Sequence, residues 1–243
     1  MAGSGFGTNF RITTWGETHG AGVGVVVDGC PAGLPLERED VQKYLDRRKP
    51  GQSKYTTQRK EGDQVEILSG IFEGRTTGTP ISMVVYNKDQ RSKDYSNIKD
   101  IYRPGHADFT FDMKYGFRDY RGGGRSSGRE TIGRVAAGAV AAKVLKELGI
   151  EIKAYAKAIA GIEVSKEHFD FAEMNNNPFN MPDKEAAKLV QEKADQMIKE
   201  MDSIGGIIEC QITGMPVGIG ETVFDKLDAE LSKAIMSIGS VKG

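Results

Sequence analysis

Cysteine is scarce in this chain of 243 residues, which contains only Cys30 and Cys210. The two cysteines form no CxxC pair and have no spacing typical of zinc ligands, so the sequence excludes a disulfide-rich scaffold and a zinc finger. Such sparing use of cysteine fits a reducing compartment, and we expect a cytoplasmic protein. We also expect both thiols to be buried in the core.

Long apolar runs are missing as well. The longest, Val23–Val27, contains a glycine and falls far short of the roughly 20 residues of a membrane span, and residues 1–10 lack the basic and apolar regions of a signal peptide. A charge excess is also absent, since 33 Lys and Arg oppose 34 Asp and Glu. This balance excludes a uniformly basic nucleic-acid coat or an acidic tail protein. We therefore expect no membrane or nucleic-acid partner, and any anion site must be local.

Glycine is abundant, with 31 residues and no collagen-like period, which indicates many tight loops. The length fits one large domain or two small ones. No internal repeat or linker interrupts the sequence, so we expect a single domain over residues 1–243.

Hydrophobic periodicity predicts short strands mixed with amphipathic helices. The predicted strands are Asn9–Thr14, Gly22–Asp28, Gln64–Phe72, Pro80–Tyr86, Ile152–Ile159 and Ile208–Ile212. The predicted helices are Leu36–Arg48, Ile132–Leu148, Asp183–Met201 and Phe224–Ile238. Strands that follow one another so closely are typical of antiparallel pairs, which indicates the α+β class. The aromatic-rich stretch Asn87–Gly128 is predicted to be irregular and functional.

Positive charge is concentrated in two stretches. Residues 43–60 hold seven basic side chains and one acidic one, and residues 118–134 hold five arginines and two acidic residues. On an otherwise acidic chain, two such stretches indicate a focused anion pocket, provided that the fold brings them together. Two solvated surface loops are the alternative.

The second basic stretch leads directly into the helix predicted from Ile132. Glycines in Arg121–Arg129 let a ligand approach the backbone, arginines offer bidentate donors, and free N–H groups at a helix start attract anions. Ser127 and Glu130 also follow a capping-box pattern, so a simple helix cap is one alternative. An Arg-Gly segment that tracks single-stranded nucleic acid is another, although an apolar helix follows it at once.

Histidine is scarce too, with three in the chain. His168 lies in a charged run that looks exposed, and we assign it no role. His19 and His106 stand beside glycine in turn-like sequences, where a loop presents a side chain to a pocket. A lone loop histidine is more often structural than catalytic, and no ligand spacing indicates a metal site.

Seven motifs in sequence order closely resemble those of the chorismate synthase family, and the resemblance runs from about Gly7 to Gly243. They are Gly16–Gly20, Gly24–Pro31, Asp46–Ser53, Thr56–Arg59, Thr76–Pro80, Arg103–Asp108 and Asp119–Ser127. Each motif alone is weak, whereas the ordered set is specific. Thr18 stands where the family usually has serine.

The resemblance implies a carbon–oxygen lyase of the shikimate pathway. The reaction is an anti-1,4-elimination of phosphate from 5-enolpyruvylshikimate 3-phosphate, which gives chorismate for aromatic amino acid biosynthesis. It requires reduced FMN without net redox change, and NADPH enters only as a source of electrons. The family also implies a homotetramer in which antiparallel sheets sandwich a layer of helices. A catalytically silent anion-binding or RNA-binding protein is the alternative.

The resemblance also assigns roles to residues of this chain. His19 is expected to protonate the leaving phosphate and His106 to donate a proton to the reduced flavin, contributions typically worth about 10²–10⁴ in rate. Arg48 and Arg129 are expected to grip the substrate. The residues expected to contact the flavin are Arg125, Ser126, Ser127, Gly239 and Ser240. Arg48 and Lys54 are further candidates for contact with NADP or a phosphate.

Family members continue for a substantial length beyond the position of Gly243. We therefore expect a single chorismate synthase domain that is C-terminally incomplete in this chain.

Overall fold

The structure is a computed structural model that describes residues 3–56, 61–88 and 99–243. It contains two compact units. The first comprises Met1–Arg48, Asp63–Gly149 and Gly214–Gly243, and the second comprises Lys49–Gly62 and Ile150–Thr213. The single domain over residues 1–243 stays a prediction.

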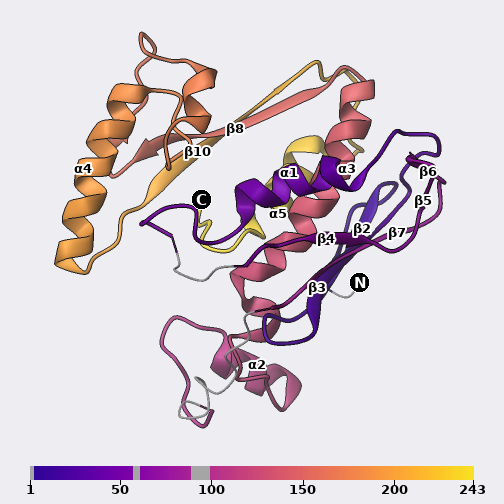
Figure 1. The fold of residues 1–243 in the computed structure, drawn as a ribbon, viewed down its shortest axis with the longest axis horizontal. Helices are drawn as coiled ribbons and strands as arrows, with labels where there is room; N and C mark the ends of the chain where they lie inside the picture. Colours follow the sequence, from indigo (N-terminus) through magenta and orange to yellow (C-terminus); the bar gives the residue numbers. More distant parts are fainter. Residues whose placement is uncertain (1–2, 57–60, 89–98) are drawn as a thin grey trace. The chain divides into compact units, whose positions relative to one another are not determined.

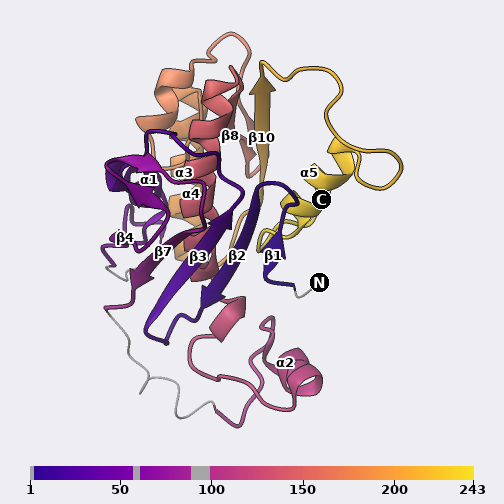
Figure 2. The ribbon, with the colours of Figure 1, turned by 90° about the vertical axis from the view of Figure 1, so that its right-hand side faces the viewer.

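A five-stranded antiparallel sheet forms the centre of the first unit (Figure 2). Its strands, in spatial order, are β1 (Gly5–Phe6), β2 (Arg11–Gly16), β3 (Gly22–Asp28), β7 (Ile81–Tyr86) and β4 (Val65–Ile67). The antiparallel pairing predicted for these segments is confirmed.

The strand predicted over Gln64–Phe72 is wrong in extent, because the chain turns inside it. Gly70 has a φ of 81°, and a Cβ there would lie 2.6 Å from Cγ1 of Ile81. This left-handed turn separates β4 from a small hairpin of β5 (Ile71–Phe72) and β6 (Arg75–Thr76).

Two helices, α1 (Arg38–Arg48) and α3 (Thr131–Glu147), pack together and against the sheet (Figure 1). The buried side chains recur every second residue on β3 and every third or fourth residue on the helices, as the two backbone periods require. They form one core, whose most completely buried members include Val23, Val25, Val27, Val41, Leu45, Ile81, Met83, Ile132 and Val140. These helices were predicted nearly as they occur.

A third helix, α2 (Asp108–Tyr115), lies inside the stretch predicted to be irregular, and that prediction is wrong there. It is short, and its large side chains Phe109, Met113 and Tyr115 are exposed, so no periodic apolar face marks it in the sequence. Two turns of 3-10 helix follow, Gly124–Ser126 and Gly128–Glu130. The C-terminal helix α5 (Leu227–Met236) is shorter than predicted.

The second unit has a three-stranded antiparallel sheet of β8 (Glu151–Ile159), β9 (Ile162–Glu163) and β10 (Gly206–Thr213). Its helix α4 (Lys184–Glu200) is capped by Asp183, whose carboxylate accepts the N–H groups of Glu185 and Ala186. A short 3-10 helix, Phe171–Asn175, precedes α4.

The two cysteines differ in burial. Cys30 is buried, as expected, but Cys210 is exposed, and the prediction of a core thiol there is wrong. The alternating pattern of β10 marked one face of a strand, yet Ile208 on that face is 69% exposed. Periodicity shows that a strand has an apolar face, but it does not show that another element covers that face.

Helices and antiparallel sheets occur in both units, which confirms the α+β class. Within the described residues, none of the helices has the length and hydropathy needed to cross a membrane.

Candidate active site

Two arginines from different elements of the first unit converge on one buried carboxylate. Arg48 ends α1, and its Nη1 donates to Oδ2 of Asp63 at 2.7 Å. Arg129 precedes α3, and its Nη1 donates to Oδ1 of the same residue at 3.1 Å. The Asp63 side chain is 0% exposed. Arg48 and Arg129, called here the guanidinium pair, therefore carry one more positive charge than their shared partner neutralises.

The remaining contacts of Arg48 tie it to the start of α3. Its Nε donates to Oγ1 of Thr131 at 3.1 Å, and its Nη2 donates to the carbonyl of Gly128 at 3.2 Å. Burial, assisted by the nearby Arg129, lowers the pKa of Arg48, and the Asp63 carboxylate opposes that shift. One arginine from each basic stretch therefore binds the same carboxylate, which is the condition that the sequence analysis set for a shared anion pocket.

Asn87 connects the guanidinium pair to the turn that carries His19. Its Oδ1 accepts from Nη2 of Arg129 at 3.0 Å. Its Nδ2 donates to the carbonyls of Glu17 and Gly20, both at 2.9 Å. A single carboxamide therefore holds the two ends of the Glu17–Gly20 turn and one of the two arginines.

His19 itself is 2% exposed and lies against the glycine-rich loop. A Cβ placed on Gly122 would lie 2.4 Å from Cδ2 of the imidazole, so only glycine leaves room for the ring. Asp119 is also close. Hydrogen bonds from Arg121 lower the pKa of Asp119 against the effect of burial, and the charge of His19 contributes in the same direction.

A cleft of the first unit, of about 590 Å³, brings together all five residues expected to contact the flavin. We call it the Arg125 cleft. Its charged lining side chains are Arg125, Glu130 and Arg134, which leaves an excess of one positive charge. The five expected residues in its lining are Arg125, Ser126, Ser127, Gly239 and Ser240.

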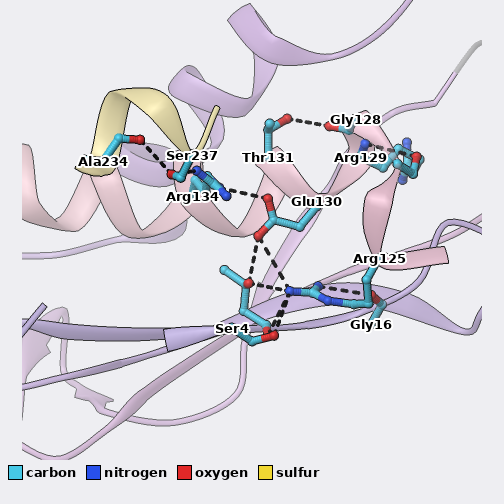
Figure 3. A network of polar contacts seen from close by, with 12 residues as sticks. Ser4, Gly16, Arg125, Gly128, Arg129, Glu130, Thr131, Arg134, Ala234 and Ser237 are labelled. Carbon is cyan, nitrogen blue, oxygen red and sulfur yellow. Dashed lines mark hydrogen bonds and ion pairs between the residues drawn. The ribbon is translucent and has the colours of Figure 1, made fainter. Parts of the chain in front are cut away.

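Figure 3 shows how the side chains around this cleft are held. Arg125 points its guanidinium at β2, where Nη2 donates to Oγ1 of Thr14 at 2.6 Å and Nη1 to the carbonyl of Gly16 at 3.2 Å. Arg134 donates to Glu130 at 2.8 Å and to Oγ of Ser237 at 2.7 Å, which links α3 to the end of α5.

The predicted capping box is only half present. Ser127 accepts the N–H of Arg129 at 3.3 Å, as a cap should. The Glu130 carboxylate accepts instead from Thr14 and Arg134, both at 2.8 Å. Glu130 therefore binds Arg134, one turn later in α3, and the Thr14 hydroxyl on β2 in place of the backbone N–H that the pattern predicted.

The Arg125 cleft fits a flavin mononucleotide in size and charge. Its volume lies within the range of about 300–1,000 Å³ that is typical of small-ligand pockets. At Gly105, Gly128 and Gly239 a Cβ would meet nothing within 4 Å, so bare backbone lines open space there. Flat rings can approach such backbone closely, and the excess positive charge suits a phosphate.

His106 lies beside this cleft in sequence, one residue after Gly105, and is exposed. Its Nδ1 lies 3.0 Å from the carbonyl of Pro104. A carbonyl only accepts, so Nδ1 carries the proton of this hydrogen bond. Asp108 fixes the preceding part of the turn, since its carboxylate accepts from the backbone N–H, Nε and Nη2 of Arg103.

Lys54 belongs to the second unit, where its Nζ forms an ion pair with Asp195 at 2.7 Å. The hydrogen bond that Lys54 donates to the Asp195 carboxylate raises the pKa of this lysine. The structure thus pairs Lys54 with a carboxylate of its own unit, and a contact with NADP or a phosphate stays a prediction.

Sequence reasoning missed Asp63 and Asn87, which join the predicted site residues to one another. Asp63 has a φ of 41°, and Asn87 directly follows β7. Neither lies in a motif, and an isolated polar residue beside a strand gives no signal of its partners. Arg134, which also lines the Arg125 cleft, was recognised only as part of the basic stretch.

Comparison with known proteins identifies the family. The family model of chorismate synthase matches residues 10–243. Chorismate synthases of Lachnospira eligens and Agathobacter rectalis are 70% and 64% identical over 243 residues. Those alignments cover 100% of this chain and 66% of each relative's length. A crystal structure of chorismate synthase matches with a TM-score of 0.77 and 31% identity, over 97% of this chain and 68% of that one. The chain therefore belongs to the chorismate synthase family.

Proposed function

We propose that the protein acts as a chorismate synthase, a carbon–oxygen lyase that eliminates phosphate from 5-enolpyruvylshikimate 3-phosphate. The observation that carries this proposal is the network in which Arg48 and Arg129 share one buried carboxylate while Asn87 ties them to the His19 turn. Paired guanidiniums linked to the turn of a histidine suit a substrate with a phosphate and two carboxylates and a leaving group that needs a proton.

The guanidinium pair would bind and orient the substrate. Arginine donates through a planar fork that matches phosphate and carboxylate geometry. In the part of the chain that the structure describes, the buried Nε of Arg129 has no hydrogen-bond partner. A substrate oxygen would satisfy it, which supports Arg129 as a ligand contact in addition to its ion pair with Asp63.

His19 would act as the acid that protonates the departing phosphate. Its burial keeps bulk water from the imidazole, so that a proton held there is delivered to the substrate. The turn that carries His19 is fixed at both ends by Asn87, which keeps the imidazole in one position.

The residues of the Arg125 cleft would hold FMN, whose reduced ring supplies electron density to the substrate during elimination. Ser126, Ser127 and the backbone around Gly239 and Ser240 would contact it, while Arg125 braces the loop against β2. His106 has committed Nδ1–H to Pro104, so it would donate to the flavin through Nε2 and only as an imidazolium. NADPH would serve only as a source of electrons for that ring.

We further propose a cytoplasmic homotetramer that contributes to the shikimate pathway and aromatic amino acid biosynthesis. Exposed apolar side chains support an oligomer, because Phe224 is 87% exposed and Ile208 69% in the single chain. Light scattering coupled to size exclusion would measure the subunit number.

The deciding experiment supplies 5-enolpyruvylshikimate 3-phosphate and chemically reduced FMN under anaerobic conditions and follows phosphate release together with chorismate absorbance. Separate titrations with each ligand distinguish a failure to bind from a failure to turn over. An RNA-binding protein would instead show a steep salt dependence of RNA affinity and leave the flavin spectrum unchanged. That pattern, without phosphate release, would reject the proposal.

A further inference from the structure

Asp63 has the properties of a residue whose task is to set the distance between two cations. Each of its oxygens accepts from a different arginine, Oδ2 from Arg48 and Oδ1 from Arg129. The side chain is completely buried, and the Arg48 and Arg129 side chains are 19% and 8% exposed. Two guanidiniums this close repel each other strongly when water is largely excluded, so the carboxylate is what holds them together.

The backbone of Asp63 is anchored as firmly as its side chain. Nε2 of Gln42, on α1, donates to the carbonyl of Asp63 at 3.2 Å, and Oε1 of Gln42 accepts the N–H of Val65 on β4 at 3.0 Å. Asp63 adopts a φ of 41°, a left-handed conformation in which aspartate and asparagine are enriched. Gln42 therefore holds the backbone around Asp63 through hydrogen bonds in which neither Arg48 nor Arg129 takes part.

Asn87 extends this arrangement to the proposed acid. Its carboxamide faces two backbone carbonyls with Nδ2 and one guanidinium with Oδ1, and a flipped amide would oppose acceptor to acceptor. Displacing Arg129 would therefore pull on the turn that holds His19, and the reverse holds too. The arginine and the histidine are coupled through one side chain.

We propose that Asp63 and Asn87 are positioning residues, which place the guanidinium pair and His19 at a fixed separation that matches the substrate. This inference rests on the proposed function, because it assigns the substrate to that pair. Neither residue touches the reacting atoms. Asp63 sets the spacing of the two cations, and Asn87 transmits that spacing to the acid.

The competing explanation is that this network only stabilises the fold. A purely structural role predicts that substitutions lower the melting temperature and leave the ligand affinity of the folded protein unchanged. A positioning role predicts a loss of substrate affinity in protein that is still folded, with flavin affinity preserved.

The test compares Asp63→Asn and Asn87→Ala with the control Asp40→Asn. Asparagine keeps the shape of Asp63 and tolerates its φ, while it removes the charge. Asp40 accepts from Lys143 in the same unit but lies outside the network, so its substitution also removes an ion pair. Calorimetry should show substrate affinity reduced by about 10-fold or more in the first two variants, with flavin affinity and the Asp40→Asn control unchanged.

A second measurement does not depend on the substrate. The chain has three histidines, so the imidazole NMR signals of His19, His106 and His168 can be assigned by substitution. Asn87→Ala should shift the His19 signals and leave those of the other two in place. Asn87→Ala leaves both ion pairs of Asp63 in place. It therefore tests the coupling between Arg129 and His19 even if Asp63→Asn fails to fold.

The two measurements separate the two proposals. If folded variants retain substrate affinity and the His19 signals do not move, the positioning role is rejected. If the unsubstituted protein does not bind 5-enolpyruvylshikimate 3-phosphate but the His19 signals still move in Asn87→Ala, the proposed function is rejected and the coupling through Asn87 stands.

Discussion

The imidazole of His19 occupies the space that a side chain on Gly122 would need. A Cβ there would lie 2.4 Å from Cδ2 and 2.6 Å from Nε2 of the ring. Gly122 also has a φ of 65°, which L side chains rarely adopt. The glycine-rich loop thus serves the histidine directly, as a surface against which the ring can lie, in addition to any contact with a ligand.

Replacing Gly122 with alanine should displace the His19 ring. We expect Gly122→Ala to lower kcat by about 10²-fold, the low end of the contribution of a general acid. The His19 NMR signals should shift at the same time. Gly138→Ala is the matched control, because a Cβ on Gly138 meets nothing within 4 Å, and it should leave turnover unchanged. Normal turnover in Gly122→Ala would show that the ring has room to move without loss of function.

Two glycines of α3 should respond to alanine in opposite ways. A Cβ on Gly133 would lie 3.0 Å from the carbonyl oxygen of Gly24 and from Cγ2 of Thr14, so Gly133→Ala should destabilise the protein by about 1–3 kcal/mol. Gly138 faces open space in the same helix, and Gly138→Ala should stabilise it by up to about 1 kcal/mol. Urea unfolding of both variants measures the difference. Equal effects would mean that helix propensity alone decides.

The core of the fold could be predicted from the sequence because apolar spacing determines it. Val23, Val25 and Val27 alternate as a strand must, and Ile132 and Val140 follow the helical period, so both elements were identified. Apolar spacing did not reveal the helix α2, whose apolar side chains are exposed, and it wrongly predicted that Cys210 is buried. In both cases burial depends on whether another element packs over the side chain, and the local sequence does not specify that packing.

The site was predictable only as separate motifs. Resemblance to the family supplied His19, Arg48 and Arg129, and the structure supplied what joins them. Asp63 lies 15 positions from Arg48 and 66 from Arg129, and no local pattern encodes such a contact. Charge counting indicated one anion pocket only on the condition that the fold brings the two basic stretches together, and it could not find the single carboxylate that binds an arginine from each.

Loss of either loop histidine should slow the reaction without unfolding the protein. We expect His19→Ala and His106→Ala each to lower turnover by about 10²-fold or more under anaerobic conditions with reduced FMN. His168→Ala is the control, since that residue lies at the surface of the second unit and pairs there with Glu185. Circular dichroism should show all three variants to be folded. Near-normal rates for both His19→Ala and His106→Ala would remove them from the mechanism.

The guanidinium pair should matter for the substrate and not for the flavin. Arg48→Ala and Arg129→Ala each remove charge-assisted hydrogen bonds worth about 1.5–3 kcal/mol, so substrate affinity should fall by about 10- to 150-fold. Arg11→Ala breaks an exposed ion pair with Asp28 and should change neither affinity. Calorimetric titration with both ligands decides. A collapse of flavin affinity with substrate affinity preserved would mean that the two pockets are assigned the wrong way round.

The turn that carries His106 should lose its anchor in acid. Hydrogen bonds from Arg103 lower the pKa of Asp108 from 3.8 to about 2, against the opposing effect of burial. A carboxylate with a depressed pKa in the folded state stabilises the protein above its unfolded pKa, and that contribution disappears as the pH falls through the folded value.

Asp108 should therefore contribute up to about 2 kcal/mol at neutral pH, and most of this contribution should be lost by about pH 2. Other carboxylates also titrate in this range, so the measurement is a difference. The free energies of unfolding of the unsubstituted protein and of Asp108→Asn are compared in urea at several pH values. The difference between the two free energies should be constant above about pH 5, should narrow as the pH falls to about 2, and should close only below that pH. A difference that does not narrow between about pH 5 and pH 2 would show that Asp108 holds Arg103 through hydrogen bonds that do not depend on its charge.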